Sequence, residues 1–262
     1  MNSIVTRRLK VGYDGVIIVP GFDVELRKGK ITSIIGANGC GKSTVLILPA
    51  EGGTVIVNDV DIKTMKSRDV AKWLAILPQT PTAPGTLTCE ELVAYGRYPY
   101  QKGMGRLTKE DRDVVSWALE ATGMLEFRQR EIACLSGGQR QRVWVAMALA
   151  QQTNIVLLDE PTTYLDLSHQ LEVLEILKHL NREQGTTIVM VLHDLNLASR
   201  YSDYLLAMKD GQIARYGTPE EVMTRDVLAE CFFIDGDVVT DRRSGKPVCL
   251  SYDLLEAKEG RV

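Results

Sequence analysis

The feature that most constrains this chain is a glycine-rich stretch, residues 36–44 (GANGCGKST), which follows a short apolar run at residues 31–35. The stretch fits the pattern G-x-x-x-x-G-K-[ST] in the strand, turn and helix context that this pattern requires. Its glycines allow several backbone N–H groups to point at one anion, and the N-terminus of the following helix favours negative charge. The stretch therefore predicts a binding site for a nucleoside triphosphate.

Two side chains of this phosphate loop have predicted roles of their own. Lys42 places a positive charge on the β- and γ-phosphates of the nucleotide, and the Ser43 hydroxyl is a ligand for Mg²⁺, which prefers oxygen. For the Cys40 thiol we expect a lowered pKa caused by helix N–H groups and Lys42, with a small inward-facing filler as the alternative. The other predicted nucleotide-binding positions of the loop are Gly36, Asn38, Gly39, Cys40, Gly41 and Thr44.

Length and composition narrow the class of protein. At 262 residues the chain is long enough for one large α/β domain, or for one domain plus a lobe. No run approaches the roughly 18 apolar residues of a membrane span, and the first residues lack a secretory signal, so we expect a cytosolic chain. A net charge of −3 gives no general attraction to nucleic acid. The five scattered cysteines predict neither disulfides nor a zinc site.

Polar residues follow two apolar runs of strand length. Asp159 and Glu160 come directly after residues 155–158, and His193 follows residues 187–192. Ligands of open α/β sheets collect outside the carboxyl ends of the strands. We therefore expect Asp159 to hold Mg²⁺, Glu160 to act on an attacking water, and His193 to contact the phosphate.

Two further signals are weak by themselves. Ser136, Gly137 and Gly138 precede a helical pattern and form a second candidate anion site, although such a stretch also occurs as an ordinary loop. Tyr13 lies in a turn upstream of the phosphate loop. Its ring is suited to stacking on a nucleotide base, whereas by itself it is more typical of a surface strand.

The segment after Thr44 departs from the expected pattern. A helix that begins in the phosphate loop must end before Pro49, which leaves about seven residues, whereas a crossover to a parallel strand takes a dozen or more. Residues 54–57 already look like the next strand. Either this helix is unusually short or residues are missing from the chain, and the sequence leaves both open.

The rest of the chain predicts alternating strands and helices with an insertion. Residues 80–107 are rich in turns and tyrosines, which indicates a surface lobe or a docking surface, and Thr108 begins a capping box for a helix that runs to Gly123. We also expect a hairpin around Asp210 and Gly211, and a short strand-like tail at 232–262. Further expected strands lie at 4–11, 16–19, 23–26 and 75–77. We also expect a short helix at 66–75, a helix at 135–150, and a long amphipathic helix through residues 171–180 that ends at about residue 184.

Taken together, these motifs resemble the ATPase subunit of ABC-type transporters. The matching stretches are residues 36–44, Gln79, residues 135–139 (the signature), 155–160, 164–166 and His193, with Tyr13 as the adenine-stacking aromatic. The resemblance implies an α/β fold of the P-loop NTPase class. It implies a mixed, mainly parallel sheet core at about 1–79 and 153–222, with an N-terminal antiparallel β part. A helical subdomain is expected at about 80–152 and a tail at 223–262.

Within this family, residues 96–101, 135–142 and 192–196 look like the importers of ferric siderophores, with heme and cobalamin importers as close relatives. The resemblance implies two ATPase subunits head to tail, with Ser136, Gly137 and Gly138 acting across the dimer. Gln139 and Asp166 join the implied nucleotide-binding positions, and Gln79 the implied catalytic and metal-binding positions. The implied partners are a membrane permease dimer docked on residues 80–105 and an extracytoplasmic siderophore-binding protein, which places the subunit at the cytoplasmic face of the membrane.

Two other functions compete with this interpretation. An ABC ATPase without a permease, acting on DNA or the ribosome, is disfavoured because the chain has no basic excess, no long coiled coil and no second ATPase copy. A subunit that binds nucleotide without hydrolysing it is disfavoured because Lys42, Asp159, Glu160 and His193 are all in place.

Overall fold

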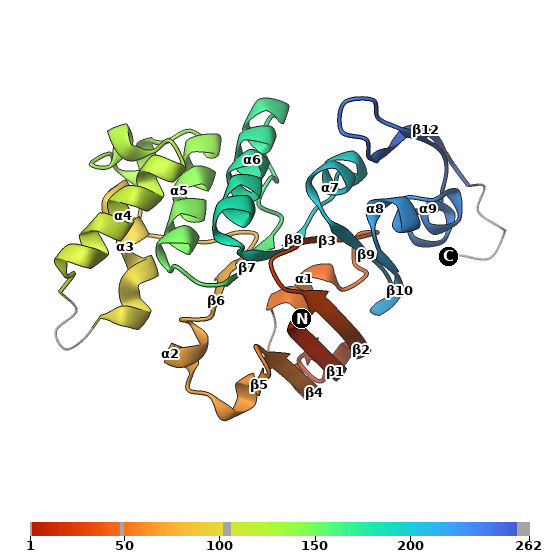
Figure 1. Ribbon diagram of the computed structural model, residues 1–262, viewed down its shortest axis with the longest axis horizontal. Coiled ribbons are helices and arrows are strands. Elements are labelled where there is room, and N and C mark those ends of the chain that lie inside the picture. Colours follow the sequence, from red (N-terminus) through yellow and green to blue (C-terminus); the bar gives the residue numbers. More distant parts are fainter. Residues whose placement is uncertain (1, 48–49, 102–105, 256–262) are drawn as a thin grey trace. The chain divides into compact units, whose positions relative to one another are not determined.

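The computed structural model describes residues 2–47, 50–101 and 106–255. The chain divides into two compact units, and Figure 1 labels most of their helices and strands. The first unit comprises Met1–Ser3, Arg27–Gly29 and Ile56–Met190, and the second comprises Ile4–Leu26, Lys30–Val55 and Val191–Val262. The boundaries of core and helical subdomain given above remain a prediction.

The second unit contains the phosphate loop and two groups of neighbouring strands. Strands β10, β9 and β3 lie in this order, with β3 and β9 parallel and β9 and β10 antiparallel, while β2, β1 and β4 form another group. Every residue of β3 is buried, including the polar Thr32 and Ser33. The elements that lie wholly or mainly here are β1 (Asn2–Tyr13), β2 (Val16–Arg27), β3 (Ile31–Gly36), α1 (Lys42–Ile47), β4 (Ala50–Val57), α7 (Leu195–Tyr201), β9 (Tyr204–Lys209), β10 (Gln212–Gly217), α8 (Pro219–Val222), α9 (Arg225–Phe232), β11 (Ile234–Thr240) and β12 (Pro247–Leu254).

Strand β2 differs from the prediction. We expected two short strands separated by a turn at Pro20 and Gly21, whereas the structure has one continuous strand through both residues. Pro20 and Gly21 are exposed, and β2 is the edge strand of its group. An edge strand tolerates proline because the missing N–H has no ladder partner to lose. Val19 and Phe22 on either side are buried, so packing carries the strand across the apparent break.

Helix α1 is as short as the sequence implied, with six residues ending at Ile47. Its buried positions are Lys42 and Leu46. Leu48 and Pro49, where the sequence predicts that the helix ends, lie outside the described residues. Strand β4 begins at Ala50, earlier than expected, and includes Gly53 with a φ of 77°. A Cβ there would lie 2.3 Å from a backbone oxygen of β1, so glycine is what permits this start.

Residues 225–254 contain more regular secondary structure than the sequence indicated. Strands β11 and β12 pair antiparallel as a hairpin, and α9, which the sequence analysis did not predict, precedes them. Asn196 of α7 fixes the hairpin with two hydrogen bonds, donating to the Cys249 carbonyl at 3.1 Å and accepting from its N–H at 2.8 Å. The predicted turn between β9 and β10 is confirmed, with positive φ at Asp210 and Gly211 as a type I′ turn requires.

The first unit combines buried strands with a helical insertion. Strands β8, β7 and β6 are neighbours in this order, β6 and β7 are parallel, and all residues of β7 and β8 are buried. Helices α3, α4 and α5 pack on one another between β6 and β7 in the chain, which confirms the predicted insertion (Figure 1). The elements are β5 (Val60–Asp61), η1 (Ile62–Thr64), α2 (Ser67–Val70), β6 (Leu74–Leu77), α3 (Cys89–Ala94), η2 (Tyr95–Tyr100), α4 (Lys109–Ala121), η3 (Leu125–Phe127), η4 (Ile132–Cys134), α5 (Gly137–Ala150), β7 (Ile155–Asp159), α6 (Leu167–Gln184) and β8 (Thr187–Val191).

Two local predictions in this unit have different outcomes. The capping box at Thr108 is confirmed, because its hydroxyl accepts from the Asp111 N–H while the Asp111 carboxylate accepts from the Thr108 N–H. The expected helix at 66–75 is wrong in length. Only Ser67–Val70 is helical. The helix then ends in turns closed by i→i+3 hydrogen bonds, from the Lys72 N–H to the Asp69 carbonyl and from the Trp73 N–H to the Val70 carbonyl, and β6 starts at Leu74. In the described part of the chain, no helix has both the length and the apolar character needed to span a bilayer.

Candidate active site

The phosphate loop lies between β3 and α1, and its lysine is folded into it. Lys42 Nζ donates to the carbonyls of Gly36 at 2.9 Å and Ala37 at 3.0 Å, and the side chain is only 5% exposed. Gly41 has a φ of 97°, which is strained for any other residue. Asn38 and Gly39 are exposed at the tip of the loop. The loop therefore places a buried cation beneath an exposed backbone turn, which suits a polyanionic ligand.

The turn between β9 and β10 supports this loop, and the sequence analysis had not assigned it a role. Gly211 N–H donates to the Cys40 carbonyl at 3.0 Å. A Cβ on Gly211 would lie 2.0 Å from the carbonyl oxygen of Ile18, so only glycine allows the turn to approach β2 this closely. The signal available in the sequence was the Asp-Gly pair, which predicts a turn but not what the turn contacts.

The expected pKa of Cys40 is wrong in direction. The thiol is 8% exposed, and burial raises its pKa above the ordinary value, while Lys42 and nearby backbone groups oppose this only in part. The alternative given above, a small filler that faces inward, describes the structure. A Cβ on Gly36 would lie 2.7 Å from Cys40 Sγ, so the thiol packs directly against the start of the loop.

His193 and Tyr13 lie in the same unit as the phosphate loop. Leu192 N–H donates to the Ile34 carbonyl at 3.2 Å, which holds the residue before His193 beside β3. His193 is exposed, and Asp194 after it caps α7 through its side chain. Tyr13 is 54% exposed at the end of β1. Both side chains are exposed, and their roles stay predictions.

The first unit holds the acidic pair that follows β7. Asp159 and Glu160 are buried, with 3% and 7% of their surface exposed. Gln79 Nε2 donates to Glu160 Oε2 at 2.6 Å, and Thr163 Oγ1 donates to the same oxygen at 2.9 Å. The parallel register pairs Leu77 of β6 with Leu158 of β7, so Gln79 and Glu160 stand two residues beyond paired positions. Thr163 was not among the predicted residues, and nothing in its local sequence marked it.

The signature residues form the start of α5 in the first unit. Ser136 is the N-cap, and it exchanges two hydrogen bonds with Gln139 in a capping box. Gly137 is exposed, whereas Gly138 is buried. Asp166 is the N-cap of α6, and its side chain accepts from the His169 N–H at 3.0 Å. Each predicted position therefore lies at a helix N-terminus, where backbone N–H groups point outward.

The predicted residues thus divide between the units. The phosphate loop, Tyr13 and His193 belong to the second unit, while Gln79, the signature residues, Asp159, Glu160 and Asp166 belong to the first. Among the described residues there is no cluster of three His, Cys, Asp or Glu side chains able to hold a metal ion.

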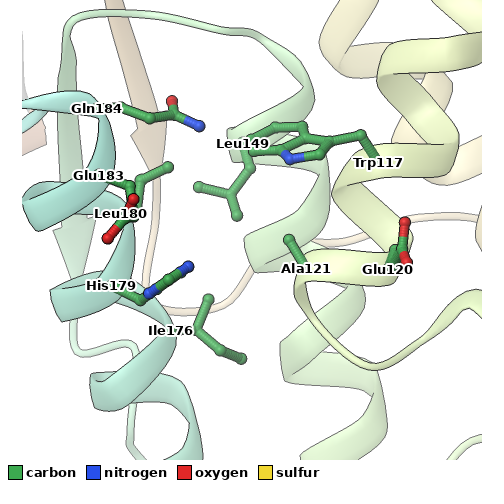
Figure 2. A pocket seen from close by; sticks show the side chains of 9 residues that line it. All are labelled: Trp117, Glu120, Ala121, Leu149, Ile176, His179, Leu180, Glu183 and Gln184. Carbon is green, nitrogen blue, oxygen red and sulfur yellow. The ribbon is translucent and has the colours of Figure 1, made fainter.

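The first unit also contains a pocket of about 460 Å³ between α4, α5 and α6. In Figure 2, Trp117 and Ala121 of α4 face Ile176 and His179 of α6 across it, with Leu149 of α5 between them. The remaining lining residues are Glu120, Leu180, Glu183 and Gln184. The pocket is lined by none of the predicted site residues, so it is separate from the acidic pair and the signature.

Comparison with known proteins agrees with the fold and the motifs. The family model described as "ABC transporter" matches residues 19–163. The iron(3+)-hydroxamate import ATP-binding protein FhuC of Bacillus subtilis (strain 168) is 56% identical over 100% of this chain and 99% of its own length. That alignment spans 267 residues, whereas this chain has 262, so the relative has residues without a counterpart here.

Solved structures of ABC transporter proteins have the same fold as this chain. A putative metal-chelate type ABC transporter in an inward-facing conformation has a TM-score of 0.81 and 26% identity, covering 96% of this chain and 98% of that one. The dimeric ATP-binding cassette MJ0796 bound to ADP and Pi has a TM-score of 0.72 and 27% identity, covering 82% of this chain and 98% of that one. The predicted α/β fold of the ABC type is confirmed, and the chain belongs to the ABC transporter family.

Proposed function

We propose that this chain is the ATP-binding and ATP-hydrolysing subunit that powers import of an iron–siderophore complex through a membrane permease. The observation that carries the proposal is the identity of 56% over the whole chain to a protein named for iron(3+)-hydroxamate import. The resemblance of this chain to the solved metal-chelate type transporter supports the same substrate class. Neither comparison favours an ATPase that acts on DNA or the ribosome, because both proteins are named for import or transport.

The phosphate loop binds the nucleotide in this proposal. Its backbone N–H groups and Lys42 hold the phosphates, and Tyr13 stacks on the adenine. The support is the exposed turn of the loop above a buried lysine. Ser43, Asp159 and Gln79 hold Mg²⁺, which when bound neutralises charge on the phosphates.

Glu160 is the proposed base that orients and deprotonates the attacking water. The two hydrogen bonds from Gln79 and Thr163 to Oε2 fix the direction of this carboxylate. Because the Glu160 carboxylate is already fixed, it loses little conformational entropy when it aligns the attacking water. Positioning of this kind is the main contribution of the protein to phosphoryl transfer. His193 is the proposed contact to the γ-phosphate.

The proposed assembly contains two copies of this chain and a permease dimer. In the proposal, Ser136, Gly137 and Gly138 of one subunit, with Gln139 and Asp166, complete the nucleotide site of the other. The dimeric structure of MJ0796 supports the pairing of two copies. The segment at 80–105 docks the permease, supported by the exposure of Tyr95 (55%) and Tyr98 (71%). The subunit lies at the cytoplasmic face of the membrane, and a siderophore-binding protein delivers cargo from the other side.

Glu160→Gln tests the catalytic part of the proposal. This variant keeps the shape of the side chain but removes the base, so turnover with the permease should fall by about 10²–10⁴ while ATP binding persists. ATP should then trap a dimer that size-exclusion chromatography detects. Lys42→Ala should lose ATP binding and form no such dimer. Near-normal turnover of Glu160→Gln would refute the assignment of the base.

Growth on a single iron source tests the substrate. A strain that lacks this gene should fail to grow when a ferric hydroxamate is the sole source of iron. The wild-type gene should restore growth, and the Glu160→Gln gene should not. The proposed substrate would be wrong if the strain without the gene grew normally on ferric hydroxamate but poorly when heme or cobalamin had to be imported. The substrate would then be heme or cobalamin.

A further inference from the structure

The side chain of His169 connects two turns that the proposed function assigns to the nucleotide. Its Nδ1 lies 2.6 Å from Asp166 Oδ1, and its backbone N–H donates to the same oxygen at 3.0 Å. The Ser168 hydroxyl donates to this oxygen as well, at 3.0 Å. These hydrogen bonds lower the pKa of Asp166, and the one from the His169 backbone N–H has the largest effect. Since the ionised carboxylate can only accept, Nδ1 of His169 carries a proton.

The other side of the same ring covers the signature. A Cβ on Gly138 would lie 2.8 Å from Cδ2 of His169 and 2.9 Å from Cγ, so the imidazole occupies the space of a side chain at this position. Gly138 is buried in the first turn of α5, directly after the Ser136 cap. The ring is therefore held between Asp166 on one side and Gly138 on the other.

A second contact joins the same two helices about one turn further along. Arg142 Nη1 of α5 lies 3.2 Å from Glu172 Oε2 of α6. This ion pair holds the helices together without touching either turn. It therefore provides a matched control, because its loss weakens the packing of α5 on α6 but leaves His169 in place.

We propose that His169 is a positioning residue that holds the signature turn (residues 136–138) and the Asp166 turn in one fixed arrangement. This inference rests on the proposed function, in which both turns act on the nucleotide of the partner subunit. Two turns that are already aligned pay less conformational entropy when the dimer closes. The phosphate loop lies elsewhere in the sequence and needs no help from His169, so loss of the ring should impair dimer closure rather than ATP binding.

The first measurement is ATP-dependent dimer formation in the Glu160→Gln chain. His169→Ala should raise the ATP concentration needed for dimer formation by about fivefold, because it removes the packing of the ring on Gly138 and a hydrogen bond to Asp166, whose side chain is 66% exposed. Binding of the fluorescent analogue MANT-ATP to the monomer should stay within about twofold. Glu172→Ala should leave both values within about twofold. His169→Asn should recover part of the loss, because its amide N–H can replace Nδ1–H toward Asp166.

Steady-state ATPase with the permease provides the second measurement. His169→Ala should lower kcat by about fivefold and leave the KM for ATP within about twofold. The kcat is calculated per site that binds MANT-ATP, so a loss of folded protein does not mimic this result. Two results would overturn the inference: dimer formation of His169→Ala at the unaltered ATP concentration, or an equal shift in Glu172→Ala. If the Glu160→Gln chain itself binds no ATP, the proposed function fails instead.

Discussion

The ion pair between Arg97 and Asp111 allows a quantitative test of what stabilises the helical insertion. Arg97 Nε donates to Asp111 Oδ1 at 2.9 Å, and the two side chains are 5% and 6% exposed. Arg97 Nη1 also donates to the Ala150 carbonyl at 2.8 Å and to Gln152 Oε1 at 3.0 Å, and the guanidinium lies 4.1 Å from the centre of the Tyr100 ring. One buried side chain thus links η2, the start of α4 and the end of α5.

Replacing Arg97 by methionine leaves a buried carboxylate without its cation. Such losses cost about 3–5 kcal/mol. We expect the lower end, about 3 kcal/mol, because Asp111 Oδ2 still accepts from the N–H and the hydroxyl of Thr108. For a chain of this size the melting temperature should fall by about 6–12 °C. The double variant Arg97→Met/Asp111→Asn should lose less than the single variant, because no charge then remains buried and unpaired.

The pH dependence of this loss follows from the pKa of Asp111. Burial acts to raise that pKa, but the hydrogen bonds from Thr108 and Arg97 outweigh it, so the folded-state pKa lies below the ordinary value. Its contribution to stability is therefore complete above the unfolded-state pKa of about 4 and is lost as the pH falls through the lower folded-state pKa. The difference between wild type and Arg97→Met should shrink below about pH 4.

Urea unfolding followed by tryptophan fluorescence measures these free energies at pH 7 and at pH 3.5. Wild type, Arg97→Met and the double variant should be compared at both values, with Lys72→Met as a control for an exposed ion pair, which should change stability by less than about 1 kcal/mol. A loss below about 1 kcal/mol in Arg97→Met at pH 7 would refute the reasoning. So would a difference from wild type that does not change with pH.

Three further predictions concern the site and the helix beneath it. Gln79→Ala should lower kcat of the ATPase by about 10–100-fold, since Glu160 loses a charge-assisted hydrogen bond, and an unchanged kcat would contradict this. Cys40 should react with N-ethylmaleimide far more slowly than the exposed Cys134, as measured by mass spectrometry, because burial raises its pKa; equal rates would contradict this. Insertion of four helix-forming residues after Leu46 should raise the melting temperature, and an unchanged or lower value would show that the six-residue helix suits the fold.

The sequence by itself determined the features that depend on local chemistry. A glycine pattern after an apolar run defined the phosphate loop, and hydroxyl and carboxyl residues three apart marked the capping box at Thr108. Continuous apolar runs identified the buried strands β7 and β8. These predictions succeeded because the physical cause, a φ angle, a capping hydrogen bond or the burial of successive side chains, lies within a few neighbouring residues.

Only the tertiary structure decided which distant groups meet. Gln79 and Glu160 are 81 residues apart in sequence and are brought together by the register of β6 and β7. The direction of the pKa shift of Cys40 depends on desolvation, which is a property of the packing around the thiol rather than of its neighbours in the loop. The same holds for His169 against Gly138, because the sequence specifies a histidine and a glycine, but the packing of two helices determines that the ring fills the place of the missing side chain.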